Sequence, residues 1–496
     1  MQLTSGTEAL TAMGTSADRQ RPTNPTVSSS PKGIRMNVNR RTVLLSSLGG
    51  ATAGIISAVV GNSLIDSLTT SPRKTPWHYH VDESTSTDDI NAWLRDRTDT
   101  GTKVLSGVHT TSTQLVVPSD TRLDLSGCTL IRGHSAGGNG GATIVNSDQE
   151  KGNHNITIIG GILLVAPHHV GKHFGFVNVS ELRISDNIIK GAAGDFMAVV
   201  KNCNNVSITR LQWSGSSHHG EDGLHLYGGS NYNISDCHIR SGDDALALTV
   251  EAPDNTVLEN VNVTNCSLSS TMASAIKIHA KPKARDAAVR SVHITNVSIV
   301  QPALNTGHDA IRMLDESSDD DKVHGITLNS INIDNSGGPG TGIRASGIDQ
   351  LTLDNISIQN IQGQSVWASG KSRDHKDLIL ENILITDQKA GSGPGITVSE
   401  ADRFTISTCV IDNPAAHGIL VRNSNYGIIR GNTISGSPQS AIRIEHSSDL
   451  TLTANLLPMN ESTVTEVGDS SGNSYDSRVA GSSARRPARP EPAGGG

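Results

Sequence analysis

Aromatic residues and long amphipathic helical stretches are scarce in this sequence. Its 496 residues include only 4 Phe, 4 Trp and 5 Tyr, whereas glycine occurs 50 times. A helical enzyme of this length would show apolar residues at helical spacing over many long segments, and this sequence does not. The composition instead favours short strands that are separated by turns.

Basic charge and metal-binding cysteine pairs are also lacking. The formal net charge is −8, and no nucleic-acid partner is expected, because the neutralisation of phosphates needs a basic surface. The five cysteines form no CxxC pair, so their spacing indicates no metal site. We expect them to be buried free thiols that pack as small apolar residues, with an unassigned structural disulfide as the alternative. No segment predicts a stable protein partner.

The N-terminal part of the chain lacks the periodicity of a folded domain. Residues 1–35 are polar and rich in Ser, Thr and Pro, which predicts a disordered extension. In residues 36–66, Arg40 and Arg41 precede an uncharged run that is rich in Gly and Ala. This arrangement resembles a twin-arginine export signal, with a retained membrane anchor as the alternative. The sequence therefore predicts a secreted or cell-surface protein.

One strand pattern returns about every 23–36 residues in the middle of the chain. It reads apolar-x-apolar-x-x-apolar-x-apolar, as in VHITNVSI from Val292 and LTLDNISI from Leu351, and it occurs about 13 times. A repeat that cannot bury its own apolar face must stack on its neighbours. Leucine-rich repeats would show leucine at constant spacing, whereas Ile and Val dominate here at variable spacing. We therefore predict an all-β fold, a single-stranded right-handed parallel β-helix, over residues 70–457.

Two flanking segments complete the predicted architecture. Residues 87–97 form the one convincing helix, which begins at a Thr/Asp cap. This helix should cover the open N-terminal end of the β-helix core. Residues 458–496 are rich in Ser, Gly, Pro and Arg, and they are predicted to form a disordered tail.

A second short strand in each coil carries ionisable residues at constant positions. In GEDGLHL (Gly220–Leu226) and GDDALAL (Gly242–Leu248), two apolar residues should point inward and the residue between them outward. Stacked coils then align one outward column, which consists of His225, Ala247, Lys277, Arg312, Arg344, Trp367, Thr397 and Arg443. The turn position, two residues before each inward pair, holds Asp222, Asp244, Ser274 and Asp309.

The carboxylates and cations on this face indicate acid–base chemistry on a carboxylated sugar polymer. Crowding raises one carboxyl pKa, so one acid keeps its proton while its neighbour is ionised. We predict Asp222, Asp243 and Asp244 as the catalytic residues, at separations that can reach the ~6.5–9.5 Å of inverting glycosidases. Aspartates at such turns can also simply bond backbone amides, and this alternative stays open. The predicted substrate-binding residues are His225, Lys277, Asp309, Arg312, Arg344 and Trp367, and the other aromatic candidates for sugar stacking are Trp213 and Tyr227.

Two of these motifs resemble glycoside hydrolase family 28, the polygalacturonases of the pectin-lyase-like superfamily. Glu221–Gly223 matches part of the Asn-Thr-Asp-Gly turn of the family, and Gly242–Asp244 matches its Asp-Asp motif. The resemblance implies that Asp243 is the general acid and that Asp222 and Asp244 activate water. It also implies a parallel β-helix and a polygalacturonase-like hydrolysis without a cofactor or metal.

Two further motifs of that family are altered in this sequence. Met272–Ala275 stands where the family has Gly-His-Gly, so its histidine is absent. Ile311–Leu314 keeps the arginine of the Arg-Ile-Lys motif as Arg312, while Leu314 replaces the lysine. Lys277, one strand away, could supply the missing charge. A uronic or sulfated glycan other than pectin is therefore as plausible a substrate.

The leading interpretation is an exported glycoside hydrolase that acts on an acidic polysaccharide. One alternative is a polysaccharide lyase or epimerase, in which Lys277 or Arg312 abstracts a proton. In that alternative the carboxylates bind Ca²⁺ through oxygen ligands, and the ligand set is Asp222, Asp243, Asp244 and Asp309. The other alternative is a non-catalytic surface or spike-like protein that binds glycans.

Overall fold

The computed structural model describes most of the predicted β-helix domain and a part of the predicted tail. The described residues are 77–98, 101–133, 141–191, 194–215, 218–251, 256–281, 286–301, 308–317, 322–335, 340–370, 375–389, 391, 393–458 and 463–476. The predicted extension 1–35 and export signal 36–66 lie outside them. In the described part of the chain, no helix combines the length and the apolar character that crossing a membrane requires.

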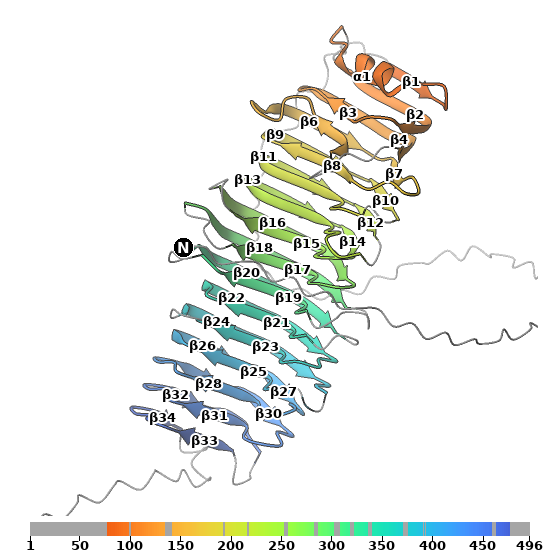
Figure 1. Ribbon diagram of the computed structural model, residues 1–496. Coiled ribbons are helices and arrows are strands. Elements are labelled where there is room, and N and C mark those ends of the chain that lie inside the picture. The colour runs from red at the N-terminus through yellow and green to blue at the C-terminus, as the bar shows by residue number, and fades with distance from the viewer. Residues whose placement is uncertain are drawn as a thin grey trace, which may run out of the picture. The chain divides into compact units, whose positions relative to one another are not determined.

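The predicted fold class is confirmed. The described strands pair in parallel and wind into about 14 turns of a right-handed β-helix (Figure 1). The strands form three stacks, one along each side of the helix. The first stack carries the predicted site, and it consists of β3 (Leu115–Val117), β5 (Ala142–Asn146), β8 (Lys172–Val177), β15 (Leu246–Val250), β17 (Ile276–Ala280), β19 (Ile311–Asp315), β21 (Ile343–Ser346), β23 (Val366–Ser369), β25 (Ile396–Ser399), β28 (Ile419–Arg422), β31 (Ile442–Glu445) and β33 (Val464–Val467), with the N-terminal parts of β11 (Ala198–Thr209) and β13 (Leu224–Ser235).

The second and third stacks are joined by several long strands that bend at a corner. The second stack consists of β1 (Trp77–Val81), β2 (Thr102–Thr111), β4 (Thr121–Arg132), β6 (Asn153–Ile159), β9 (Val179–Ser185), β16 (Val257–Ser270), β18 (Ala288–Val300), β20 (Val323–Asp334), β22 (Asp349–Gln359), β24 (His375–Thr386), β26 (Ala401–Ser407), β29 (Ile428–Arg430), β32 (Thr451–Thr453) and β34 (Ser474–Tyr475), with the C-terminal parts of β11 and β13. The third stack consists of β7 (Ile162–Val165), β10 (Ile188–Lys190), β12 (Gln212–Ser214), β14 (His238–Ser241), β27 (Val410–Asp412) and β30 (Thr433–Ser435), with the C-terminal halves of β2, β4, β16, β18, β20, β22 and β24.

Asparagines make the corner between the second and third stacks. Asn265, Asn296 and Asn355 have φ values of 55°, 54° and 54°, a left-handed conformation that asparagine adopts more readily than most residues. Their side chains also connect the turns, since Asn296 Nδ2 donates to Asn265 Oδ1 at 2.8 Å. These residues explain why an Asn interrupts the two halves of so many strand blocks.

The core is a continuous column of aliphatic side chains inside the three stacks. The inward residues of the first stack, such as Leu226, Ile278 and Ile444, are fully buried. The five cysteines are also buried and free, as expected. Since each turn buries its apolar residues only against its neighbours, the fold is stabilised turn by turn.

The helix α1 (Thr87–Arg95) lies at the N-terminal end of the β-helix, next to β1 and β3 (Figure 1). Ile90 and Leu94 are buried in the same core as the strands, which confirms that α1 covers the end of the core. Its cap is Ser86, whose hydroxyl accepts a hydrogen bond from the Asp89 amide at 3.1 Å, and not the predicted Thr/Asp pair.

The predicted start of the disordered tail at residue 458 is wrong. The strand β33 pairs with β31, and β34 pairs with β32. The parallel β-helix therefore continues to Tyr475. These two strands are short and polar, and they complete a turn that the apolar strand pattern does not reveal. The rest of the predicted tail, residues 477–496, lies outside the described residues.

Candidate active site

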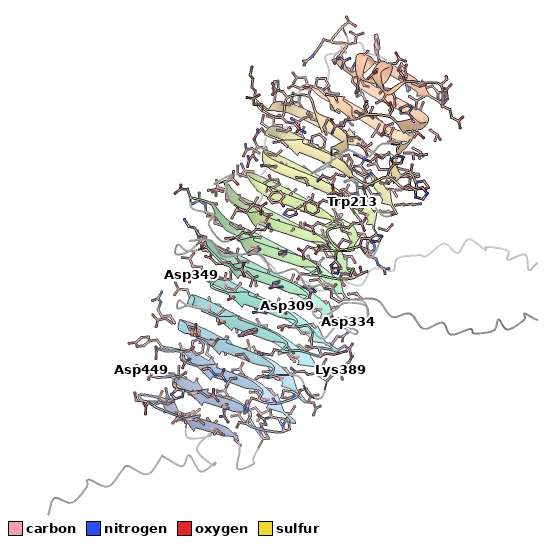
Figure 2. The ribbon with its side chains drawn as sticks, viewed as in Figure 1. Trp213, Asp309, Asp334, Asp349, Lys389 and Asp449 are labelled. Atoms are coloured by element: carbon pink, nitrogen blue, oxygen red, sulfur yellow. The ribbon has the colours of Figure 1, made fainter. Side chains whose placement is uncertain are left out.

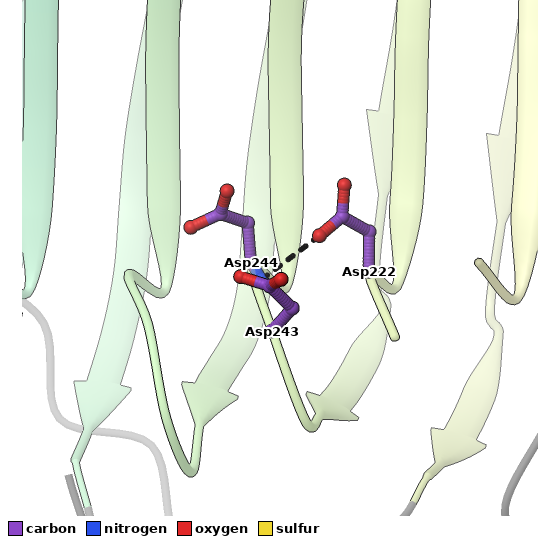
Figure 3. Close-up of side chains that lie close together, drawn as sticks. All are labelled: Asp222, Asp243 and Asp244. Carbon is purple, nitrogen blue, oxygen red and sulfur yellow. Dashed lines mark hydrogen bonds between the residues drawn. The ribbon is translucent and has the colours of Figure 1, made fainter. Parts of the chain in front are cut away.

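The predicted catalytic carboxyls come together at the turns that precede β13 and β15. Oxygens of Asp222, Asp243 and Asp244 lie within 4.8 Å of one another (Figure 3). Asp222 and Asp244 occupy the same turn position in successive coils and are almost fully buried, whereas Asp243 is half-buried. The oxygens are closer than the ~6.5–9.5 Å separation of inverting glycosidases.

A glycine lets the two turns approach each other. A Cβ atom on Gly223 would lie 2.4 Å from the Ala245 carbonyl oxygen and 2.5 Å from Ile239 Cγ2. Any other residue after Asp222 would push the next turn away, because those neighbours are backbone and core atoms. The Asp-Gly sequence thus places the first carboxylate directly beside the following turn.

Each turn aspartate divides its two oxygens between two kinds of partner. Oδ1 accepts a backbone N–H from the next turn, at 3.1 Å from Asp244 to Asp222, from Ser274 to Asp244 and from Thr341 to Asp309. Oδ2 faces a side chain of the outward column. These aspartates can therefore bond backbone amides and serve a catalytic site at the same time, because a different oxygen serves each role.

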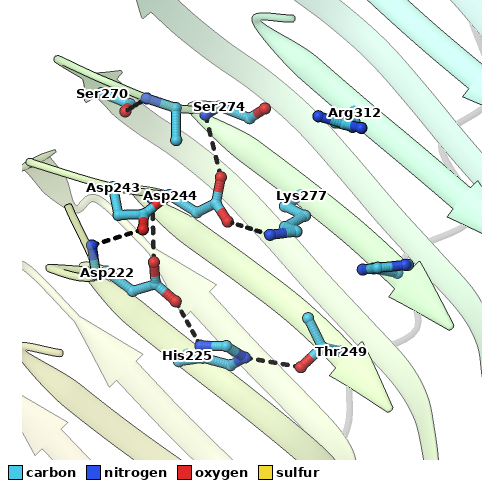
Figure 4. Close-up of polar contacts among 12 residues, drawn as sticks. Asp222, His225, Asp243, Asp244, Thr249, Ser270, Ser274, Lys277 and Arg312 are labelled. Atoms are coloured by element: carbon cyan, nitrogen blue, oxygen red, sulfur yellow. Dashed lines mark hydrogen bonds and ion pairs between the residues drawn. The ribbon is translucent and has the colours of Figure 1, made fainter. Parts of the chain in front are cut away.

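His225 links the first carboxylate to the next strand. Its Nδ1 lies 2.5 Å from Asp222 Oδ2, and its Nε2 lies 2.7 Å from Thr249 Oγ1 (Figure 4). The imidazole ring stacks on Tyr227, with 3.9 Å between the ring centroids. The Phe196 ring is tilted against the imidazole, with 5.0 Å between their centroids. His225 is only 5% exposed. It was predicted to contact substrate, but in the free protein it lies under its neighbours and positions Asp222.

Burial sets the protonation of this pair. Burial, with a smaller contribution from Asp243, raises the pKa of Asp222 to about 7. Burial also lowers the pKa of His225 to about 3, so its imidazole is neutral. The Asp222 carboxyl therefore retains a proton near neutral pH, and burial contributes more to this than the crowding of carboxyls that the sequence predicted.

Lys277 forms an ion pair with the second buried carboxylate. Its Nζ lies 2.8 Å from Asp244 Oδ2 (Figure 4). Burial by itself would lower the pKa of Lys277, but Asp244 and the two nearby aspartates outweigh this effect and raise it. Burial raises the pKa of Asp244 in spite of the lysine. Lys277 is thus a charged residue of the site.

The outward column continues as predicted beyond Lys277. The strand registers align Lys277 with Arg312, Arg312 with Arg344, and Arg344 with Trp367. The guanidinium carbon of Arg344 lies 4.3 Å from the centroid of the Trp367 ring. The buried Nε atoms of Arg312 and Arg344 have no hydrogen-bond partner in the described structure. A row of cations that ends at an aromatic face therefore leads away from the carboxylates.

Asp309 does not belong to the group that the three catalytic candidates form. Its Oδ2 lies 4.0 Å from Arg312 Nε, so it positions this arginine. The geometry would allow a divalent cation to bind one oxygen each from Asp222, Asp243 and Asp244. Asp309, which the lyase alternative added to the Ca²⁺ ligands, is not in that group.

The prediction of Trp213 as a sugar-stacking residue is wrong. Trp213 is the inward residue of β12, is fully buried, and lies 6.2 Å from the Phe174 ring in the core (Figure 2). Thr249 and Phe196 also belong to the site, although they are not among the predicted residues. Strand alternation could have identified Thr249, since it is the next outward residue after Ala247. Phe196 occupies the turn position one coil before Asp222.

A part of the sequence also matches the fold that the structure shows. Residues 341–484 match the family model described as "Right handed beta helix region". The chain matches none of the curated proteins.

Solved structures show the same fold at low sequence identity. The pre-mature gene product 12 of bacteriophage phi29 has a TM-score of 0.53 and 14% identity, and the match covers 80% of this chain and 55% of that chain. The chain therefore spans only about half the length of that relative. A polygalacturonase of Erwinia carotovora has a TM-score of 0.41 and 13% identity, covering 81% of this chain and 100% of that chain. A surface adhesin of Streptococcus pneumoniae has a TM-score of 0.40 and 12% identity, covering 80% and 91%.

Proposed function

We propose that this protein hydrolyses glycosidic bonds of an acidic polysaccharide by carboxylate acid–base catalysis. The observation that carries this proposal is the group of three carboxylates within 4.8 Å of one another, beside a charged lysine. Carboxylates buried this closely oppose folding through desolvation and repulsion, and strongly perturbed groups of this kind concentrate at functional sites. The partial resemblance to polygalacturonases supports the same reaction class.

The three carboxyls would act as one unit that both donates and accepts protons. Coupled carboxyls share their protons, so the group can give one to the departing sugar oxygen. Asp243 is the most accessible of the three and is best placed to deliver it. Asp222 and Asp244, when ionised, would activate a water molecule. These are the roles that the family resemblance implies.

The outward column would bind the acidic groups of the substrate. The guanidinium groups of Arg312 and Arg344 match the geometry of a carboxylate or sulfate. The Trp367 ring offers an apolar face on which a sugar ring can stack. Both arginines are partly exposed, so their guanidinium groups can reach a bound ligand.

The structure does not favour the lyase alternative. Proton abstraction by Lys277 needs a neutral amine, but the surrounding carboxylates raise its pKa. The second candidate base, Arg312, carries a guanidinium that stays protonated in proteins. A hydrolase of this kind would need no Ca²⁺, so its activity should survive a chelator.

The proposed site of action is outside the cytoplasm. This part of the proposal depends on the twin-arginine pattern at Arg40 and Arg41. A fusion of residues 1–76 to a reporter that is active only after export would test it. Replacement of both arginines by lysine should abolish the signal.

The first experiment is an activity panel with the purified full chain. The substrates are polygalacturonate, alginate, hyaluronate and a sulfated galactan, and the measurement is the release of new reducing ends. Asp243→Asn is assayed in parallel, with Gln439→Ala as the matched control, because Gln439 stands three residues before the inward Ile442 as Asp243 stands before Leu246.

Reducing ends that appear with the wild type and the control, and vanish in Asp243→Asn, would support the proposal. Chelator sensitivity together with a product that absorbs ultraviolet light would instead identify a lyase. No product from any substrate, with all proteins equally folded, would contradict the hydrolase proposal and favour a glycan-binding protein.

A further inference from the structure

A basic pocket lies on the second stack, away from the carboxylate site. The strands β4, β6, β9 and β11 align Arg122 with Thr157, Thr157 with Arg183, and Arg183 with Ser207. The catalytic candidates belong to turns before the first stack. The strands that line the pocket therefore lie on another side of the β-helix, and Figure 1 shows them towards its N-terminal end.

The pocket arises from a short residue between two long ones. Arg122 and Arg183 are exposed, while Thr157 between them is only 8% exposed. With about 4.8 Å between neighbouring strands, the two arginines stand roughly 10 Å apart at their backbones. The resulting cavity has a volume of about 280 Å³. This lies near the lower end of the range for small-molecule sites, so it admits a small sugar unit and not a long oligomer.

Positive charge is concentrated in this pocket. Its lining includes three arginines and one acid, Asp186. Arg210 is held by Asp186 through two bonds, of 2.7 Å from Nε and 2.8 Å from Nη2. Arg122 and Arg183 have no hydrogen bond or ion pair within the described part of the chain. Two guanidinium groups are therefore free to bind a ligand in a protein of net charge −8.

The same column carries no such charge in the following turns. After Ser207 the register continues through Asn233 and Asn262 to His293 and Thr327. None of these side chains is an arginine or a lysine. The pair of cations is thus a local feature of one pocket and not a general property of this stack.

We propose that this pocket is a second, non-catalytic carbohydrate site that binds a sugar unit with a carboxylate or sulfate group. Arginine binds both anions through parallel N–H donors, and the hydroxyls of Thr157 and Ser207 can bond sugar hydroxyls. A long phosphate polymer would need a basic track, which the neutral column beyond Ser207 does not provide. The site does not depend on the proposed hydrolysis, and a polymer held at both sites would bind more tightly than at either.

Calorimetric titration of the full chain tests this site. The probes are a tetragalacturonate and a sulfated heparin-derived tetrasaccharide, with neutral maltotetraose for comparison. All proteins carry Lys277→Gln and Arg312→Gln, which weaken binding at the catalytic face. Arg122→Gln/Arg183→Gln is compared with Arg430→Gln, an exposed arginine of the same stack whose register partners are Ser407 and Thr453.

At least one anionic probe should bind, and maltotetraose should not. The double variant should weaken binding by about tenfold or more, because it removes two charge-assisted contacts, while Arg430→Gln should leave the dissociation constant unchanged. The two probes distinguish the carboxylate from the sulfate. Equal affinity in both variants, no binding of either anionic probe, or tighter binding of a single-stranded oligonucleotide would overturn the proposal. A failure of the activity panel would not affect this result.

Discussion

The coils around the carboxylates and the coils near the C-terminal end have the same backbone arrangement, but they have different residues at the turn position. Near the end of the helix, His417 and Ser440 occupy the position that Asp244 and Ser274 hold at the site. In both regions the first side chain accepts the amide of the second, at 3.2 Å for His417 Nδ1 and 3.1 Å for Asp244 Oδ1. The bond between turns is therefore independent of charge.

The difference lies in the remaining polar atom and in the length of the connection. Asp244 has a second oxygen, which binds Lys277. In the sequence, 30 residues separate Asp244 from Ser274, whereas 23 separate His417 from Ser440. The turns near the C-terminal end are regular, and their turn residues only connect one turn to the next. The turns at the carboxylates have longer connections and carry charged side chains on the same backbone. Function is thus placed on positions whose first role is structural.

The largest expected effect separates the two regions by activity. Asp244→Asn keeps the amide acceptor but loses the charge, and it should reduce hydrolysis by about 10²–10⁴-fold. His417→Gln, the matched change near the C-terminal end, should leave the rate unchanged. Initial rates on the best substrate of the panel provide the measurement. An Asp244→Asn variant with wild-type activity would exclude Asp244 from the catalytic group.

Core substitutions should lower the free energy of unfolding to a similar extent in the two regions. Ile278 and Ile444 are both fully buried inward residues of the first stack. Replacement of either by alanine should lower the free energy of unfolding by about 2–5 kcal/mol, because a cavity remains in both cases. Urea denaturation followed by circular dichroism measures this. A much smaller loss for Ile278→Ala would show that the core is looser beneath the site.

The site should make stability depend on pH. The pKa of Asp222 is about 7 in the folded protein, whereas the ordinary value of 3.8 applies to the unfolded chain. Between these two pH values the native state therefore binds more protons than the unfolded chain. The stability from Asp222 is therefore fully present below pH 4 and lost as the pH rises through 7.

Asp222→Asn should remove this slope and make the protein more stable than the wild type at pH 8, by roughly 2–4 kcal/mol. Urea denaturation at pH 4, 6 and 8 tests the prediction. Thr397→Val, which changes no charge in the regular part of the column, serves as the control and should keep the slope. An unchanged slope in Asp222→Asn would mean that this carboxyl is ionised throughout.

The bonds between turns should have a smaller and equal effect in both regions. His417→Ala and Asp309→Ala each leave a backbone N–H of the next turn without its acceptor, which costs about 1–3 kcal/mol. Asp309→Asn keeps an acceptor and should cost less than Asp309→Ala. Thermal unfolding of the three variants compares them. A loss in Asp309→Asn as large as in Asp309→Ala would assign the effect to the Arg312 contact instead.

The sequence predicts the stacks well because strand alternation is a local property. The column from Lys277 to Trp367 is in the predicted register, since each of these coils presents two inward aliphatic residues with one residue between them. The cluster of Asp222, Asp243 and Asp244 follows from the same alignment.

The errors concern residues whose surroundings come from other coils. Trp213 could be read as a surface residue until its inward orientation in β12 was known. His225 occupies an outward position, but Tyr227 and Phe196 cover it, and their approach depends on side-chain directions that a pattern does not contain. The short polar strands β33 and β34 lack an apolar block, so only their pairing shows that the helix continues.

The regular turns also define a unit by which this protein could change length. Ile396, Ile419 and Ile442 follow one another in the first stack, and each is fully buried. Deletion of residues 419–441 would bring Ile442 to the place of Ile419, with Val421 replaced by Ile444 and Ile429 by Leu452. The one conflict is at Gly427, whose place Leu450 would take, because even a Cβ atom there would lie 2.1 Å from Phe404 Cζ. A gene could thus gain or lose one whole turn in a single recombination event, provided that a glycine is kept opposite Phe404.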